Sequence, residues 1–127
     1  MIIHGISINP LLKAQENFEL FRQDMVTDRD HAGAIQAYEY CFELAWKTMK
    51  RVLEARGQIA NSPREAFRLA AREGFIDNPE IWFDFMKERN RTVHCYDREV
   101  LDEVISYLPQ FSEELQKFLV NLAKLGE

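Results

Sequence analysis

Residues 34–53 read AIQAYEYCFELAWKTMKRVL, and the spacing of their apolar side chains decides the fold. Apolar residues recur three and four positions apart, which on a helix places them on one face. The central stripe holds Ile35, Tyr38, Phe42, Ala45, Trp46, Met49 and Leu53. Other apolar residues widen this stripe, so only a narrow polar wedge remains: Gln36, Glu39, Glu43, Lys47, Lys50 and Arg51. Such a helix is either central in a bundle or buried against a second chain.

Outward from this stretch, helix ends are marked by capping residues. A capping side chain followed by proline, typical of a helix start, occurs at Asn9-Pro10, Ser62-Pro63 and Asn78-Pro79. Glu65 follows Ser62 at the spacing of a capping box, and Gly57 and Gly74 stand where left-handed helix ends are expected. Together these signals predict helices over residues 10–26, 29–56, 62–73, 79–94 and 97–125, with no competing strand pattern.

The last predicted helix contains Pro109, yet its apolar spacing continues unbroken on both sides of the proline. We therefore expect a kink rather than a break. Four main helices with short connections predict an all-α fold, an antiparallel up-and-down four-helix bundle. Residues 62–73 would form a short extra helix in a connection. The length of 127 residues fits a single domain over residues 1–127.

Composition excludes several classes of protein. The net charge of −5 argues against a broad basic surface for duplex DNA. No run of apolar residues is long enough to span a membrane, and the first residues do not resemble a signal peptide, so we expect a cytoplasmic protein. Cys41 and Cys95 form no disulfide framework and no zinc motif, and we expect neither metal nor cofactor.

Net positive charge is confined to one stretch of the sequence. Residues 86–98 sum to +2, whereas residues 1–85 sum to −3 and residues 99–127 to −4. Within this basic stretch, Arg89 lies on the stripe that we expect to face inward, formed by Ile81, Trp82, Phe85, Met86 and Val93. A guanidinium there needs a partner or a ligand. The simplest partner is a carboxylate such as Glu39 or Glu43.

Arg89 and His94 are five residues apart, which separates them by about 140° on an unbroken helix. Asn90, not Arg89, stacks with His94 at the i, i+4 spacing. Within one chain the two side chains would flank a groove but converge poorly. Asp97 is a suitable N-cap for the final helix, which leaves Tyr96 exposed at the junction.

The segment Arg89-Asn90-Arg91-Thr92-Val93-His94-Cys95-Tyr96, with its Arg-x4-His-x-Tyr pattern, resembles the signature of the HEPN superfamily, and specifically of the HepT-like toxins. These are also described as nucleotidyltransferase substrate-binding proteins. The resemblance extends to residues 42–47 and 62–65, so it covers most of the chain.

The resemblance implies a homodimer in which two such motifs form one cleft that cuts RNA without a metal. It implies that Arg89 and His94 are catalytic, with Asn90 and Glu43 as supporting polar groups. A neutral histidine suits proton removal from a ribose 2′-hydroxyl, and a guanidinium suits the charge that develops on the phosphoryl oxygens. The expected partner is an MntA-like nucleotidyltransferase antitoxin that transfers AMP to Tyr96.

Two other functions fit the same sequence. The chain could be a non-catalytic subunit that presents a substrate to a separate nucleotidyltransferase, as the older family description implies. It could also be a purely structural helical partner that uses the wide apolar surface of residues 34–53. A structural partner would have no need for Arg89 on an apolar stripe.

Overall fold

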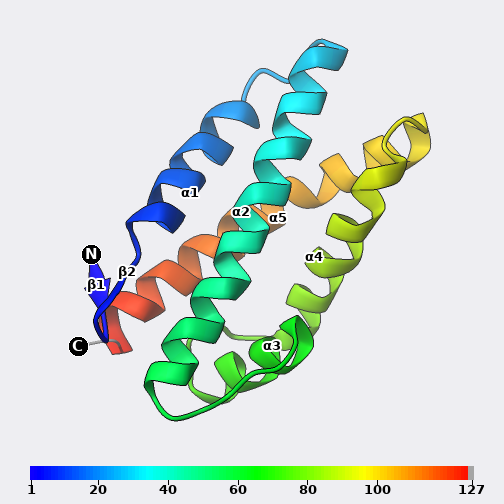
Figure 1. The fold of residues 1–127 in the computed structure, drawn as a ribbon. Helices are drawn as coiled ribbons and strands as arrows, with labels where there is room; N and C mark the ends of the chain where they lie inside the picture. The colour runs from blue at the N-terminus through cyan, green and yellow to red at the C-terminus, as the bar shows by residue number, and fades with distance from the viewer. Residues whose placement is uncertain (126–127) are drawn as a thin grey trace.

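The computed structural model describes residues 1–125, which form five α-helices, one 3-10 turn and a small hairpin. The α-helices are α1 (Asn9–Phe21), α2 (Asp28–Ala55), α3 (Pro63–Arg72), α4 (Pro79–Arg91) and α5 (Arg98–Leu125). A 3-10 turn, η1 (Thr92–His94), follows α4 directly. Helices α1 and α2 lie antiparallel side by side, α5 crosses behind α2, and the short α3 lies between the lower ends of α2 and α4 (Figure 1). The predicted helical bundle with an extra helix in a connection is confirmed.

Most predicted helix ends are close to the observed ones. Asn78 accepts a hydrogen bond from the Glu80 N–H, and the Ser62 hydroxyl accepts one from the Glu65 N–H, so both are N-caps. The Glu65 carboxylate accepts from Asn61 rather than from Ser62, so the capping box is shifted by one residue. Gly57 ends its segment in the left-handed region, with φ of 84°.

The prediction for the first helix was wrong at both ends. Ile8, not Asn9, occupies the N-cap, and the Asn9 side chain instead accepts a hydrogen bond from the N-terminal ammonium. At the other end, α1 stops at Phe21 instead of residue 26, and Asp24 in the connection to α2 has a left-handed φ of 52°. A full capping box between Thr27 and Asp30 then starts α2.

A second correction concerns strands, of which the sequence predicted none. β1 (Ile2–Ile3) and β2 (Ile6–Ser7) pair antiparallel around His4 and Gly5. Both turn residues have positive φ, as in the two-residue hairpin turns that match strand twist. Ile3, Ile6 and the following Ile8 are buried, so the hairpin covers part of the core.

The core is an aromatic cluster centred on Phe111 of α5. Its ring contacts five others at centroid distances of 5.0–6.3 Å, from Phe18, Tyr38, Phe42, Trp82 and Phe85. The Tyr38 hydroxyl donates a buried hydrogen bond of 2.6 Å to the Phe85 carbonyl. Because α5 runs unbroken through Pro109, it presents Phe111 to all the neighbouring helices. This packing sets the position of α4 against α2.

Candidate functional site

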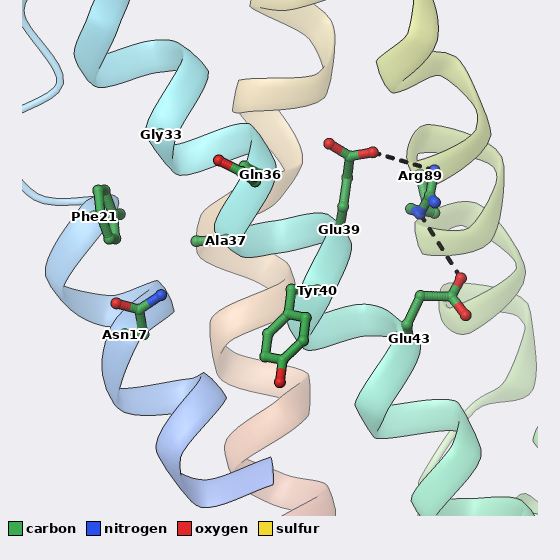
Figure 2. Close-up of a pocket in the computed structure, with 9 residues that line it drawn as sticks. All are labelled: Asn17, Phe21, Gly33, Gln36, Ala37, Glu39, Tyr40, Glu43 and Arg89. Atoms are coloured by element: carbon green, nitrogen blue, oxygen red, sulfur yellow. Dashed lines mark ion pairs between the residues drawn. The ribbon is translucent and has the colours of Figure 1, made fainter. Parts of the chain in front are cut away.

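Arg89 extends from α4 toward α2, where two carboxylates bracket its guanidinium (Figure 2). The Nη1 atom lies 3.4 Å from Glu39 Oε2, and Nε lies 3.7 Å from Glu43 Oε1. Glu39 and Glu43 are one turn apart on the polar wedge of α2, so both face α4. The sequence left open which of the two pairs with Arg89, and the structure shows that both do.

The Arg89 guanidinium has ion-pair partners, but not all of its N–H donors are hydrogen-bonded. Its Nε atom is buried and has no hydrogen-bond partner among the described residues, since the Glu43 oxygen is too far for a good hydrogen bond. The Arg89 side chain is 26% exposed. A charged donor in this state can still bind an incoming anion.

Thr92 completes the surroundings of Arg89, a role that the sequence did not reveal. It is buried at the start of η1, where its hydroxyl lies 2.7 Å from the Arg89 carbonyl and 3.1 Å from Glu39 Oε2. The same oxygen accepts a hydrogen bond of 3.4 Å from Arg89 Nη1. The hydroxyl therefore links α2 to the point where α4 becomes a 3-10 turn.

His94 and Tyr96 lie at the solvent-exposed junction of α4 and α5. Both are exposed, Tyr96 to 86%, as the sequence predicted for the tyrosine. Their rings meet edge to face with centroids 6.0 Å apart. Asp97 caps α5 as predicted, by accepting a hydrogen bond from the Glu99 N–H. Asn90 is exposed as well.

Val93 corrects the predicted inward stripe of this helix. It is 67% exposed, although Trp82 and Phe85 of the same stripe are fully buried. The reason is the change to three residues per turn in η1, which rotates Val93 away from the core and lets Thr92 take the buried place.

The two other arginines of residues 86–98 form ion pairs with nearby carboxylates. Arg91 binds the buried Glu88 at 3.2 Å and Glu103 of α5 at 2.6 Å, and these carboxylates raise the pKa of Arg91. Arg98 lies 3.5 Å from both Asp28 and Asp102. Only Lys87 has no ion pair within residues 1–125. The positive sum of residues 86–98 therefore does not make a basic surface there.

Arg89 forms one wall of an open groove with a volume of about 560 Å³. The floor is the outer face of α2, and Asn17 and Phe21 of α1 form the opposite wall (Figure 2). Tyr40 is 60% exposed on the floor. His94 is absent from the residues that line this groove.

A second hollow, of about 450 Å³, lies on the other side of the junction. Tyr96 and Cys95 line it together with residues from the start of α2 and α5, among them His31 and Arg98. The pKa of Cys95 is raised by partial burial and by the nearby Glu39 carboxylate. The hollow lies directly beside the exposed tyrosine.

Residues 1–125 contain no group of three or more His, Cys, Asp or Glu side chains that is placed to hold a metal ion. No helix within the same residues is both long and apolar enough to cross a bilayer.

The fold and the site define a class: a helical bundle with an Arg-x4-His motif at the junction of its last two long helices. A family model described as nucleotidyltransferase substrate binding protein like matches residues 8–124. The chain belongs to this family, which confirms the HepT-like resemblance. It is 30% identical over 119 residues to a probable ribonuclease HepT of Haemophilus influenzae, a match that covers 90% of this chain and 82% of that protein.

Solved structures share the fold. A Haemophilus influenzae protein described as revealing the fold of a substrate binding domain of a nucleotidyltransferase superposes with a TM-score of 0.83 at 30% identity, over 92% of this chain and 99% of its own. A Thermus thermophilus protein gives 0.82 at 24% identity, over 88% and 98%. A mutant of the toxin–antitoxin MntA–HepT gives 0.78 at 17% identity, over 92% and 94%, and this likeness concerns the fold alone.

Proposed function

We propose that this chain is the toxin of a two-gene toxin–antitoxin module and cuts RNA as a metal-independent endonuclease. The observation that carries the proposal is Arg89, a partly open guanidinium held between two carboxylates beside a groove, five residues before an exposed histidine. The relationship to a probable ribonuclease HepT at 30% identity supports it.

The proposed chemistry uses His94 and Arg89 in different roles. Neutral His94 accepts the proton of a ribose 2′-hydroxyl, whose oxygen then attacks the adjacent phosphorus. The bond from phosphorus to the 5′-oxygen breaks and that oxygen takes up a proton from water, which leaves a 2′,3′-cyclic phosphate and a 5′-hydroxyl, and His94 then returns its proton to the solvent. Arg89 stabilises the negative charge that develops on the phosphoryl oxygens. Glu43 orients the guanidinium, and Asn90 supplies a supporting hydrogen bond to the RNA.

The active form in this proposal is a homodimer. Arg89 lines the groove and His94 does not, which favours a site that a second chain completes. A second copy that docks across α2 and α4 would bring its own histidine to this arginine. Exposed Tyr40 and Phe21, at 60% and 42%, supply apolar area for such a contact.

Control of the enzyme is proposed to act at Tyr96. A partner nucleotidyltransferase, of the kind named in the MntA–HepT structure, would transfer AMP from ATP to the phenolic oxygen and release pyrophosphate. Tyr96 is 86% exposed and therefore open to such an enzyme, and because its ring contacts that of His94, an added phosphate would lie near this histidine. Added negative charge there would repel RNA phosphates.

The alternative is a non-catalytic subunit that presents a substrate to a nucleotidyltransferase, and the family description favours it. Under this alternative, the groove beside Arg89 holds the substrate. The two functions differ in whether the isolated protein breaks a phosphodiester bond.

The test incubates the purified protein with mixed RNA in EDTA and compares it with His94→Ala and with His4→Asn. His4 is an exposed hairpin residue far from the motif in sequence, so it provides a matched histidine control. We expect His94→Ala to cleave about 10²–10⁴-fold more slowly, and His4→Asn to cleave like the unmodified protein. Equal cleavage by all three, or cleavage by none, would refute the ribonuclease.

For the control step, the protein is incubated with its partner nucleotidyltransferase and ATP and then examined by mass spectrometry. A mass increase of one AMP on Tyr96, absent in Tyr96→Phe but present in Tyr107→Phe, supports the assignment. A modification that persists in Tyr96→Phe contradicts it.

A further inference from the structure

Helix α3 presents three arginines in a row on its outer face. Arg64, Arg68 and Arg72 follow one another at i, i+4 spacing and are all exposed. Like charges at this spacing destabilise a helix unless an anion lies between them. None of the three is within ion-pair distance of a carboxylate among residues 1–125.

The acidic residues of α3 and its cap are engaged elsewhere. The Glu65 carboxylate accepts a hydrogen bond from the Asn61 N–H at the start of the helix. Glu73 pairs with Arg56 at the end of α2, at 3.6 Å. The outer face of α3 is therefore basic, although the sequence around it carries almost balanced charge.

Two of these arginines are held on one aromatic ring of α4. The Cζ atoms of Arg64 and Arg68 lie 5.2 Å and 5.3 Å from the centroid of Phe83. The cation–π contact holds each guanidinium near the ring, and an exposed guanidinium can bind a phosphate with two hydrogen bonds. Phe83 itself is fixed by Phe67 of α3, with centroids 6.0 Å apart.

From Phe83, a line of exposed side chains leads along α4 to the motif histidine. Lys87 and Asn90 follow Phe83 at intervals of four and three residues and share its face of α4, and His94 follows in η1, beyond the end of the helix. At 1.5 Å per residue, Phe83 and the last residue of α4, Arg91, are about 12 Å apart along the axis, and η1 continues from there to His94. Figure 1 shows α4 running from α3 up to the junction with α5. Acidic Glu80 lies three residues before Phe83, and Asp84 lies three residues before Lys87, so two carboxylates border the first turns of this line.

We propose that Arg64, Arg68 and Lys87 form a basic track that binds the phosphates of the RNA strand leading to His94. This inference rests on the proposed ribonuclease function. A polyanion suits the arrangement because the cations are spaced along a line that ends at the reacting residue. An acidic partner protein would gain nothing from that continuity with His94. The track also explains how a chain of net charge −5 binds RNA.

The test measures how RNA binding depends on salt. A fluorescent single-stranded RNA is titrated with His94→Ala, which leaves it uncut, and with the same protein carrying Arg64→Gln and Arg68→Gln. For single strands each phosphate contact contributes about 0.7 to the slope of log K against log salt, so the double change should flatten the slope by about 1.4. Adding Lys87→Gln should flatten it by about 0.7 more.

The matched control removes two cations elsewhere, with Lys13→Gln on α1 and Arg29→Gln at the start of α2. It should keep the original slope. Arg64→Lys with Arg68→Lys keeps the charge and should keep most of the slope, which separates a charge effect from misfolding. In the protein with an intact His94, the two glutamine substitutions should raise KM with little change in kcat.

The outcomes separate the two proposals. Equal slopes for the track and control variants, in a protein that still cuts RNA, would overturn the basic track and leave the ribonuclease standing. The basic track would also be overturned if the double variant no longer bound the nucleotidyltransferase but kept the salt dependence of its RNA binding. The arginines would then form a protein-binding surface. Absence of RNA binding and cleavage in every variant would overturn both proposals.

Discussion

The Thr92 hydroxyl lies within hydrogen-bond distance of three groups around the candidate site: the Glu39 carboxylate, the Arg89 carbonyl and the Arg89 guanidinium. We expect Thr92→Val to lower the free energy of unfolding by about 1–2 kcal/mol, because the side chain keeps its shape but leaves buried polar groups without a partner. Thr92→Ser keeps the hydroxyl and should cost less. Urea unfolding of the three proteins measures the difference, and equal midpoints would show that the hydroxyl contributes nothing.

The two cysteines differ in reactivity for a physical reason. Burial raises the pKa of Cys41 to about 12, and partial burial with nearby carboxylates raises that of Cys95 as well. A raised pKa means less thiolate, the reactive form, at neutral pH. In the folded protein at pH 8 we expect Cys95 to react with Ellman's reagent more slowly than a free thiol and Cys41 not to react. Cys95→Ser should then leave a folded protein with no fast thiol. Rapid release of the coloured thiolate of Ellman's reagent by Cys95→Ser would contradict the burial of Cys41.

The residues around Arg89 show which features of the site can be predicted from the sequence. The sequence named both candidate carboxylates and the exposed Tyr96, because helical spacing places them on known faces. It missed Thr92, since the switch from α-helix to 3-10 turn depends on contacts with α2 and leaves no mark in the apolar spacing. Val93 was placed wrongly for the same reason.

At the scale of the elements, substitutions of Gly57 test whether a left-handed residue is needed at the end of α2. The φ of Gly57 is 84°, and a Cβ atom added there would meet nothing within 4 Å, so a substitution acts only through the backbone. Gly57→Ala should lower the free energy of unfolding by about 1 kcal/mol. Gly57→Asn should cost less, because asparagine tolerates the left-handed region. Thermal unfolding compares them, and a larger loss for asparagine would contradict this explanation.

The elements also show which helix boundaries a sequence can reveal. Capping residues and glycines mark the ends of α2 and α3 well, because their hydrogen bonds are local. The end of α1 was missed since Met25 and Val26 continue its apolar pattern, although Val26 is 81% exposed. The outer arginines of α3 leave no mark in the net charge of their segment, because a sum along the chain does not distinguish the faces of a helix.

For the whole molecule, the central question is whether Arg89 and His94 act within one chain or between two. The groove beside Arg89 does not include His94, which is exposed at the junction of α4 and α5. A site shared between subunits resolves this geometry, as in two-fold dimers where each surface meets its own copy.

Mixing two inactive variants tests the shared site directly. Arg89→Ala retains His94, and His94→Ala retains Arg89, so a mixed dimer contains one complete pair across the interface. When the two proteins are unfolded together and refolded, about half of the dimers should be mixed if the variants associate equally. RNA cleavage should then return to a substantial fraction of the original rate. The matched control mixes Arg89→Ala with the double variant Arg89→Ala/His94→Ala, which supplies no arginine and should stay inactive. If affinity tags prove that mixed dimers have formed and no cleavage returns, the pair does not work across the interface.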